Sequence, residues 1–316
     1  MVIQHAGKPD QALSYSEFLS AAAAYAQAYR QAGLHPGEVI VLILQHSRDL
    51  ISAFWGAILH GAIPSIMPFL TEKLQPERYR SDLAALIEVT RPAALVTYPE
   101  FENEVQSALT AESSVRIVLT CDAVSARTDA HLAVDFNNLP GIERHPGEVT
   151  LLQHSSGTTG LQKGVALSHQ AVLNQIESYS GVLGFTSQDV VVSWLPLYHD
   201  MGLIAGFVMP ILVGAQLVLM SPFDWVKAPY RLLQSISHYR GTFTWLPNFA
   251  YNFCAAKVRD RDLAGVNLSC LRAVINCSEP VRWESHQRFS ERFASYGLRP
   301  EVFATCYAMA ENVFAV

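Results

Sequence analysis

The stretch QHSSGTTGLQKGVALS, residues 153–168, decides the fold and organises the rest of the chain. It combines hydroxyl side chains with small residues that let backbone N–H groups approach one anion without interference from Cβ atoms. A flexible lysine adds a positive charge suited to a polyphosphate. The apolar residues at 165–167 predict a strand that holds the far end of the loop. The residues with this chemistry are Ser155, Ser156, Gly157, Thr158, Thr159, Gly160, Lys163 and Gly164.

Two common phosphate-binding loops do not fit this stretch. A Walker A loop needs Gly directly before its Lys, whereas Gln162 precedes Lys163, and no G-x-G-x-x-G dinucleotide fingerprint occurs. An ordinary surface turn is the simplest alternative, because Ser, Thr and Gly dominate loops. The density of hydrogen-bond donors favours a phosphate-binding loop over that alternative.

The string SSGTTGLQKGVALSH closely resembles the phosphate-binding signature of the AMP-forming adenylating enzymes. That superfamily includes acyl-CoA synthetases, luciferases, amino-acid adenylation domains and fatty-acyl-AMP ligases. The resemblance implies that ATP binds with its β- and γ-phosphates at this loop. A second string, WLPLYHDMGLI at 194–204, is most similar to the fatty-acyl-AMP ligase branch.

The composition describes a well-buried globular chain. It has 316 residues, of which 50% are hydrophobic and 16% charged, and this length favours two lobes over one core. The net charge of −6 argues against nucleic acid as a partner. Five scattered cysteines without C-x-x-C spacing indicate reduced thiols rather than disulfides or a zinc site. We therefore expect a cytoplasmic protein.

One uncharged stretch, Met201–Met220, has the length of a membrane-spanning helix. Pro210 and Gly214 interrupt it, and no Lys/Arg cluster flanks it. A buried helix, a turn at Gly214 and a buried strand at 216–220 fit the sequence better, so we expect no membrane span.

Apolar runs typical of buried strands alternate with helical patterns along the chain. Ser14 and Glu17 form a capping box that opens a helix through about Gln31. The alternation predicts an α/β fold with doubly wound parallel sheets, with an irregular, exposed excursion at 121–147. The resemblance implies two stacked subdomains in five layers, αβαβα. We expect residues 1–185, which include the phosphate loop, to form the first subdomain and 186–316 the second.

His199 follows a predicted strand at 190–194, at the carboxyl end where open α/β sheets bind ligands. Taken alone, it is more simply interpreted as a capping or packing histidine. The resemblance implies that it borders the carboxylate of the substrate. Asp200 fits as the N-cap of the next helix, although a matching Asp in amino-acid adenylation domains pairs with the substrate's ammonium group.

Aromatic residues gather in FTWLPNFAYNF at 243–253. Most such aromatics belong to a core. The resemblance implies that this segment lines an acyl tunnel, with the apolar helix from Met201 as another wall. The predicted substrate contacts are Met201, Trp245, Asn248 and Phe249.

Two further turns are predicted to hold the nucleotide. NCSEP at 276–280 matches a turn that touches adenine in the family, although two of its residues replace the commoner Gly/Ala pair and no partner base supports Cys277 as a nucleophile. TCYAMAEN at 305–312 offers an aromatic ring for stacking on adenine and a carboxylate for Mg²⁺. The predicted nucleotide contacts are Asn276, Cys277, Ser278, Glu279, Tyr307 and Ala308, the last where the family usually has Gly. The predicted metal ligands are Glu311 and Thr159.

These motifs together predict an AMP-forming acyl ligase. It uses ATP and Mg²⁺ to convert a carboxylic acid, in our interpretation a fatty acid, to acyl-AMP with release of pyrophosphate. The acyl group then passes to the thiol of coenzyme A or of a carrier-protein phosphopantetheine. The predicted catalytic residues are His199, Lys163 and Glu311.

The resemblance covers only the N-terminal portion of such enzymes. The family's β-barrel subdomain, its ribose-binding Asp and its mobile C-terminal domain with a lysine have no counterpart before Val316. We therefore expect this chain alone to be inactive. A non-catalytic fragment that binds nucleotide or acyl groups and an amino-acid adenylating enzyme remain the alternatives.

Overall fold

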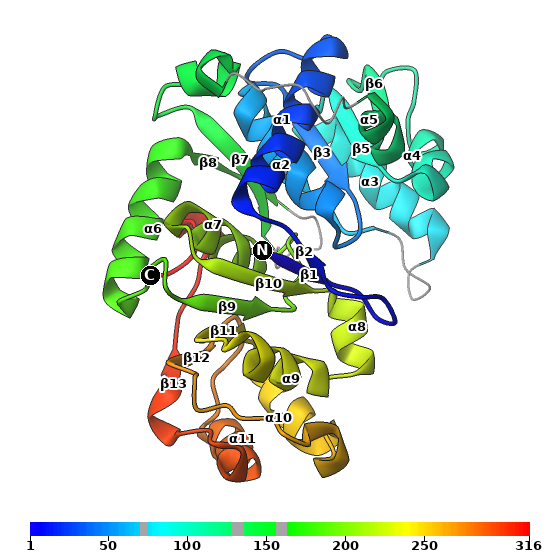
Figure 1. The fold of residues 1–316 in the computed structure, drawn as a ribbon. Coiled ribbons are helices and arrows are strands. Elements are labelled where there is room, and N and C mark those ends of the chain that lie inside the picture. The colour runs from blue at the N-terminus through cyan, green and yellow to red at the C-terminus, as the bar shows by residue number, and fades with distance from the viewer. Residues whose placement is uncertain (70–74, 128–135, 156–162) are drawn as a thin grey trace. The chain divides into compact units, whose positions relative to one another are not determined.

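The computed structural model describes residues 1–69, 75–127, 136–155 and 163–316. They form two compact units, one of residues 13–172 and one of residues 1–12 and 173–316. Each unit contains one sheet of mainly parallel strands with helices packed beside it (Figure 1), so the predicted α/β class is confirmed. We call them the six-stranded unit and the seven-stranded unit after their sheets.

The observed division differs from the expected ranges 1–185 and 186–316. The N-terminal strand β1 (Val2–Gln4) pairs in parallel with β10 (Gln216–Met220) and so belongs to the seven-stranded unit. Nothing in three residues signals a partner more than 200 positions away, because strand pairing of this kind is a tertiary effect.

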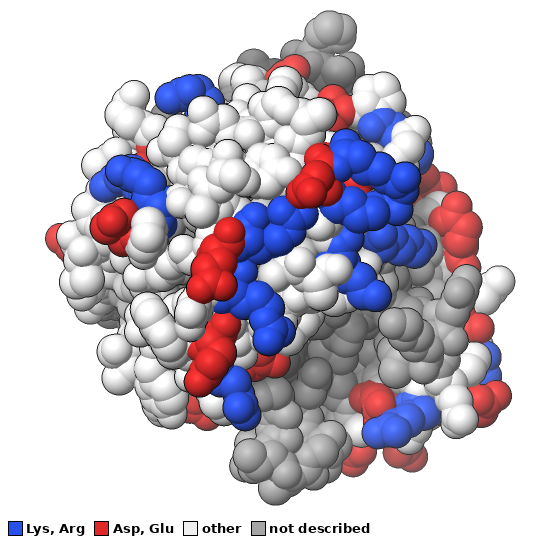
Figure 2. All heavy atoms as spheres, turned by 90° about the horizontal axis from the view of Figure 1, so that it is seen from below, with Lys and Arg blue, Asp and Glu red and all other residues white. Residues whose placement is uncertain are grey.

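Charged side chains of both signs lie together on the face drawn in Figure 2. The C-terminal part of the chain contains ion pairs of this kind. Arg259 Nε lies 3.0 Å from Asp262 Oδ2, and Arg292 Nη2 lies 2.7 Å from Asp260 Oδ1. Such exposed pairs contribute little to folding, because water and salt screen them.

The six-stranded unit has the strand order β6-β5-β3-β4-β7-β8, in which only the β7–β8 pair is antiparallel. The chain crosses back over the sheet through helices, as a parallel sheet requires. The strands are β3 (Val39–Ile43), β4 (Ile63–Ile66), β5 (Ala94–Thr97), β6 (Ile117–Thr120), β7 (Val149–Ser155) and β8 (Lys163–Ser168), and the helices are α1 (Tyr15–Gln31), α2 (Arg48–His60), α3 (Pro76–Thr90), α4 (Glu102–Ser107) and α5 (Cys121–Arg127).

The capping box predicted at the start of α1 is present. Ser14 Oγ accepts from Glu17 N at 3.2 Å, and Ser14 N donates to Glu17 Oε2 at 2.8 Å. Helix α1 packs closely on α2 at Gly56, where an added Cβ would lie 2.5 Å from Tyr25 Cβ. The expected irregular excursion at 121–147 was partly wrong, because α5 occupies its first seven residues and 3-10 turns follow at Phe136–Asn138 and Pro140–Glu143.

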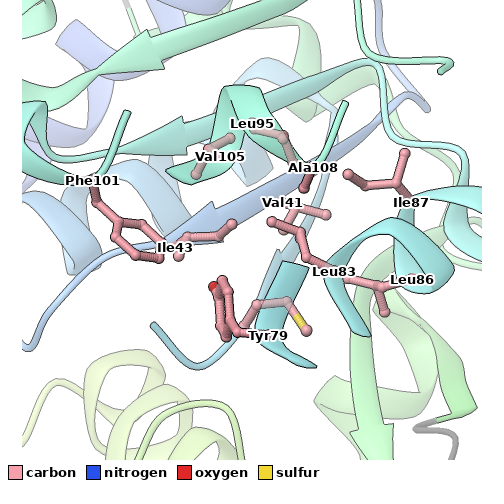
Figure 3. Packing of buried hydrophobic residues seen from close by; sticks show 11 residues of the cluster. Val41, Ile43, Tyr79, Leu83, Leu86, Ile87, Leu95, Phe101, Val105 and Ala108 are labelled. Carbon is pink, nitrogen blue, oxygen red and sulfur yellow. The ribbon is translucent and has the colours of Figure 1, made fainter. Parts of the chain in front are cut away.

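A hydrophobic cluster fills the space between the sheet and helices α3 and α4 (Figure 3). Strand residues such as Val41 and Leu95 meet helix residues such as Leu83 and Val105, and all four are almost fully buried. Each such side chain contributes about 1.5–3 kcal/mol by leaving water. This core supports the sheet that carries the β7–β8 pair.

The seven-stranded unit has the strand order β13-β12-β11-β9-β10-β1-β2, parallel except for β2. The uncharged stretch at 201–220 forms a buried π-helix η4 (Met201–Val208), α7 (Met209–Val213), a left-handed Gly214 and β10, as predicted except for the π geometry. Its other elements are β2 (Gln11–Ala12), α6 (His169–Leu183), β9 (Val190–Ser193), α8 (Pro222–Lys227), α9 (Tyr230–Tyr239), β11 (Phe243–Leu246), α10 (Asn248–Lys257), β12 (Ala273–Asn276), α11 (Trp283–Phe293), β13 (Phe303–Thr305) and the 3-10 turns Asp260–Leu263, Ala294–Tyr296, Pro300–Val302 and Ala310–Asn312.

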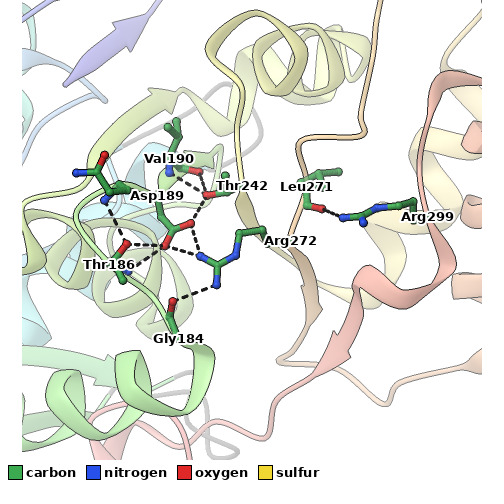
Figure 4. Close-up of polar contacts among 9 residues, drawn as sticks. Gly184, Thr186, Asp189, Val190, Thr242, Leu271, Arg272 and Arg299 are labelled. Atoms are coloured by element: carbon green, nitrogen blue, oxygen red, sulfur yellow. Dashed lines mark hydrogen bonds and ion pairs between the residues drawn. The ribbon is translucent and has the colours of Figure 1, made fainter.

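A buried carboxylate joins the amino ends of three neighbouring strands in this sheet (Figure 4). Asp189 precedes β9, Thr242 precedes β11 and Arg272 precedes β12. Arg272 Nη1 lies 2.6 Å and 2.7 Å from the two carboxylate oxygens of Asp189, and Thr242 Oγ1 donates to it at 2.9 Å. Burial alone would raise the pKa of Asp189, but hydrogen bonds from Arg272, Thr186 N and Thr242 outweigh it, so the pKa is lowered.

We predict that Asp189→Ala lowers the free energy of unfolding by about 2–4 kcal/mol, because Arg272 loses the carboxylate that balances its charge and Thr242 loses its shorter hydrogen bond. A lowered carboxylate pKa stabilises the fold above the ordinary value of 3.8, and this stabilisation is lost as the pH falls through the folded-state value. The difference between wild type and variant should therefore shrink in acid. Urea unfolding followed by circular dichroism at neutral pH and near pH 3 measures both effects.

The matched control is Asp82→Ala, whose carboxylate pairs with Arg78 only at 3.9 Å on an exposed helix face. It should change the stability little. Equal effects of the two substitutions would contradict the role assigned to Asp189.

Candidate active site

The carboxyl ends of β9, β11, β12 and β13 meet at one edge of the seven-stranded sheet, because these strands run parallel. The segments that leave this edge begin at Trp194, Pro247, Cys277 and Cys306. They carry the sequence-predicted site residues outside the phosphate loop except Trp245 and Asn276, which lie within β11 and β12 themselves. Open α/β sheets bind ligands beyond the carboxyl ends of their strands, so this edge is the candidate site of the unit.

His199 and Asp200 form a hydrogen-bonded pair after β9. His199 Nδ1 lies 2.5 Å from Asp200 Oδ1, and the same oxygen accepts from Met201 N at 2.7 Å. Asp200 therefore caps η4, as the sequence predicts, and also holds the half-exposed imidazole in one orientation. A contact of this ring with a ligand stays a prediction.

Two glycines allow η4 to approach the strand end closely. A Cβ at Gly202 would lie 2.2 Å from Pro196 O, and one at Gly206 would lie 2.8 Å from Ser193 Oγ. The buried Met201 side chain at the start of η4 reaches the next turn, where Ser278 Oγ lies 3.9 Å from its sulfur. π-helical segments are frequent at functional sites, and here one links the His199 segment to the turn after β12.

The turn after β12 and the start of α10 share one hydrogen-bond framework. Asn248 Oδ1 accepts from Asn276 Nδ2 at 3.1 Å and from Arg282 N at 3.0 Å. Glu279 Oε2 accepts from Phe249 N at 2.8 Å, which satisfies a free N–H at the helix N-terminus. The predicted nucleotide turn and the predicted substrate segment are therefore brought together. Direct ligand contacts of Asn248, Asn276 and Glu279 stay predictions.

The turn itself has a strained backbone. Ser278 has a φ of 72°, a left-handed conformation that favours glycine. Asn276 is fully buried, and within the described residues its Oδ1 has no hydrogen-bond partner. Strain and unpaired polar atoms of this kind persist where the surrounding structure imposes them, which is common at functional sites.

Two residues that support the turn at 276–279 were not predicted from the sequence. Ser285 Oγ accepts from Asn248 Nδ2 at 3.1 Å, and His286 Nε2 lies 2.8 Å from Asn276 Nδ2. Burial lowers the pKa of His286, which favours the neutral ring. Both residues lie on α11, and no short motif connects them to positions 248 and 276.

The predicted substrate residues differ in what they contact. Trp245 is fully buried and donates from Nε1 to Tyr179 OH at 2.9 Å, and its contact with a substrate stays a prediction. Phe249 is 46% exposed and packs edge-on against Trp194 and Trp225, whose rings stack at 3.6 Å. Neither tryptophan was among the predicted site residues, and Trp225 lies in α8, a helix that was not predicted.

The segment after β13 presents the other two predicted functional groups. Tyr307 is 69% exposed, so one ring face is open for stacking. Glu311 lies exposed in a 3-10 turn. Ala308 bridges to Ala315, and Val316 N donates to Tyr307 O at 3.0 Å, so the segment folds back on itself.

The phosphate loop connects β7 and β8 in the six-stranded unit. These strands are antiparallel, and their ladder continues to the pair Ser155–Lys163 at the two ends of the loop. The predicted strand at 165–167 is confirmed as part of β8. The predicted loop residues Ser156, Gly157, Thr158, Thr159 and Gly160 lie outside the described residues.

The comparisons with known proteins agree with this arrangement. A family described as AMP-binding enzyme matches residues 2–316. The chain is similar to the long-chain-fatty-acid–AMP ligase FadD26 of Mycobacterium bovis, with 29% identity over 96% of this chain and 51% of the relative. It is also similar to the medium-chain-fatty-acid–[acyl-carrier-protein] ligase JamA of Moorena producens, with 27% identity over 99% of this chain and 52% of that protein.

A solved structure supports the same relationship. The fatty acyl-adenylate ligase from L. pneumophila, in complex with acyl adenylate and pyrophosphate, matches with a TM-score of 0.83 and 26% identity over 98% of this chain. The match covers 52% of that structure. The chain thus spans about half the length of the relatives it matches.

We predict that Gly202→Ala destabilises the seven-stranded unit by about 2 kcal/mol or more, because the added methyl overlaps the backbone oxygen of Pro196 and overpacking is costly. The control is Gly181→Ala in α6, where an added Cβ meets nothing within 4 Å. That change should be neutral or stabilising by up to about 1 kcal/mol. Chemical denaturation followed by circular dichroism measures both variants, and a neutral Gly202→Ala would contradict the close approach of η4.

Proposed function

The chain belongs to the AMP-binding enzyme family, and from this we propose that it forms the ATP- and acid-binding half of an enzyme that activates a fatty acid as acyl-AMP. Pyrophosphate is the second product. The observation that carries the proposal is the carboxyl edge of the seven-stranded sheet, where His199, the turn at 276–279 and Tyr307 follow three strands of one sheet.

In this mechanism the nucleotide and the acid bind at that edge. Tyr307 stacks on the adenine ring, and the turn at 276–279 contacts the edge of the same ring. The acid's carboxylate attacks the α-phosphorus of ATP in line, a P–O bond forms to the carboxylate oxygen, and the bond to the departing pyrophosphate breaks. His199, held by Asp200, borders the reacting carboxylate. Phosphoryl chemistry of this kind depends on positioning and on neutralising charge.

The departing pyrophosphate needs positive charge and hydrogen-bond donors. Lys163 and the loop from Ser155 to Gly164 are proposed to supply them, because fixed donors aimed at developing charge lower the barrier. Loss of several such donors at once should slow adenylation more than loss of any one.

We propose that a magnesium ion binds at this site. Among the described residues, no group of three or more His, Cys, Asp or Glu side chains is arranged to hold a metal ion. Mg²⁺ does not need one, because it binds through one or two carboxylates together with substrate phosphates. We propose that the exposed Glu311, with Thr159, holds the ion, which would neutralise phosphate charge when bound.

The surroundings of Asp200 support an acyl rather than an amino-acid substrate. Its Oδ1 already contacts His199 and Met201 N, and η4 beyond it is uncharged and buried. Phe249 adds an exposed aromatic surface near Trp194. We propose a fatty acid as substrate and the thiol of coenzyme A or of a carrier-protein phosphopantetheine as acceptor.

We further propose that the protein acts in the cytoplasm. All five cysteines are free thiols in the structure, which suits a reducing compartment. Within the described ranges, no helix combines the length and the apolar character needed to cross a membrane.

We predict that Lys163→Ala and Glu311→Ala each lower fatty-acid-dependent ATP–pyrophosphate exchange about 10²–10³-fold, the usual cost of losing one group that stabilises transition-state charge. The assay uses the chain extended by the second half that its relatives carry. Lys257→Ala, exposed in the last turn of α10 and so at the far end of the helix that leaves the sheet edge, is the control and should retain full exchange. Full exchange in the Lys163→Ala/Glu311→Ala double variant would contradict the proposal.

A further inference from the structure

Two cysteines lie side by side at the carboxyl edge of the seven-stranded sheet. Cys277 directly follows β12 and Cys306 directly follows β13. The two strands are parallel neighbours whose last paired residues are Asn276 and Thr305, and Cys306 N donates to Asn276 O at 2.9 Å. The ladder thus runs directly into the two cysteines, and each thiol shifts the pKa of the other.

This placement has the geometry of a disulfide-forming pair. Neighbouring strands lie about 4.8 Å apart, which falls within the Cα separations of about 4.4–6.8 Å found for disulfides. Residues opposite each other on adjacent parallel strands point to the same face, so neither side chain needs to turn through the sheet. The two residues are adjacent across the ends of paired strands, so little backbone movement is required to join them.

The two thiols have different surroundings. Cys277 is fully buried, whereas Cys306 is half-buried. Hydrogen bonds from the Cys277 thiol and from Tyr179 lower the pKa of Cys306, against the effect of burial. The contact with Cys306, together with burial, raises the pKa of Cys277. Cys306 is therefore the accessible thiol that ionises first, and Cys277 is its protected neighbour.

We propose that Cys277 and Cys306 are a covalent modification site at which a low-molecular-weight disulfide oxidises the thiol pair to an intramolecular disulfide. The thiolate of Cys306 attacks one sulfur of the small disulfide, forms a mixed disulfide and releases one small thiol. Cys277 then loses its proton and attacks the Cys306 sulfur, which forms the protein disulfide and releases the second small thiol. Two protein thiols are oxidised and one small disulfide is reduced to two thiols.

The test treats the reduced chain with oxidised glutathione and then analyses it by mass spectrometry after digestion. The wild type should lose two hydrogens and two titratable thiols and should yield one linked peptide pair, Cys277 with Cys306. Cys277→Ser should retain glutathione on Cys306, because the second thiol is missing. Cys306→Ser should leave Cys277 unmodified, because that thiol is buried.

The matched control is Cys270→Ser. Cys270 is also half-buried, but its sulfur contacts the backbone oxygen of Ile236 at 3.6 Å rather than another thiol. This variant should form the same disulfide as the wild type. A folded wild type that keeps both thiols, or that carries glutathione on Cys306 without the link, would overturn the proposal. The wild-type measurement alone decides this point if a variant fails to fold.

A consequence for activity rests on the proposed function. Cys277 and Cys306 adjoin Ser278 and Tyr307, so a disulfide fixes the spacing of the two proposed nucleotide turns. Pyrophosphate exchange by the extended protein should then fall on oxidation and recover on reduction. The disulfide and the proposed function can be tested separately. Mass spectrometry detects disulfide formation, and ATP–pyrophosphate exchange measures adenylation.

Discussion

The parallel alignment of β9, β11, β12 and β13 is the constraint on which the candidate site depends. It brings four chain segments, separated by up to about a hundred residues, to one edge of a sheet. The opposite edge is fixed by a charge-assisted contact, since Asp189, Thr242 and Arg272 tie the amino ends of β9, β11 and β12 together. The positions of the segments at the carboxyl ends of these strands therefore depend in part on the polar contacts at their amino ends.

Much of the fold could be predicted because local patterns were strong. The apolar run at 39–44 became β3, the Ser14–Glu17 capping box opened α1, and the uncharged stretch at 201–220 formed a buried helix and strand as expected. What could not be predicted depends on contacts distant in sequence. The three-residue β1 requires β10, and the π geometry of η4 follows from close contacts at Gly202 and Gly206 that no periodicity reveals.

The sequence predicted which segments form the candidate site better than it predicted what each residue in them contacts. His199, Ser278 and Tyr307 were predicted because they follow apolar strands in turns that resemble the family's motifs, and the structure places all three just beyond the carboxyl ends of strands in one sheet. Trp245 was predicted as a substrate contact because its segment resembles the acyl branch of the family, and the structure adds that its ring is buried and hydrogen-bonded to Tyr179. Ser285 and His286, which support the turn at 276–279, carry no signal, because their partners lie far away in the sequence. Through most of the chain the local sequence and the observed structure agree. They agree less well at the turn at 276–279, which is expected of a functional site.

The proposed function requires this chain to bind ATP and a fatty acid for adenylation. The most direct measurement is mass-spectrometric detection of the adenylate after incubation of the chain, extended by the second half its relatives carry, with ATP, Mg²⁺ and matched panels of fatty and amino acids. The account predicts acyl-AMP and pyrophosphate with fatty acids and no aminoacyl-AMP. Absence of any adenylate from a folded protein that still binds nucleotide would contradict it, as would adenylates formed only with amino acids.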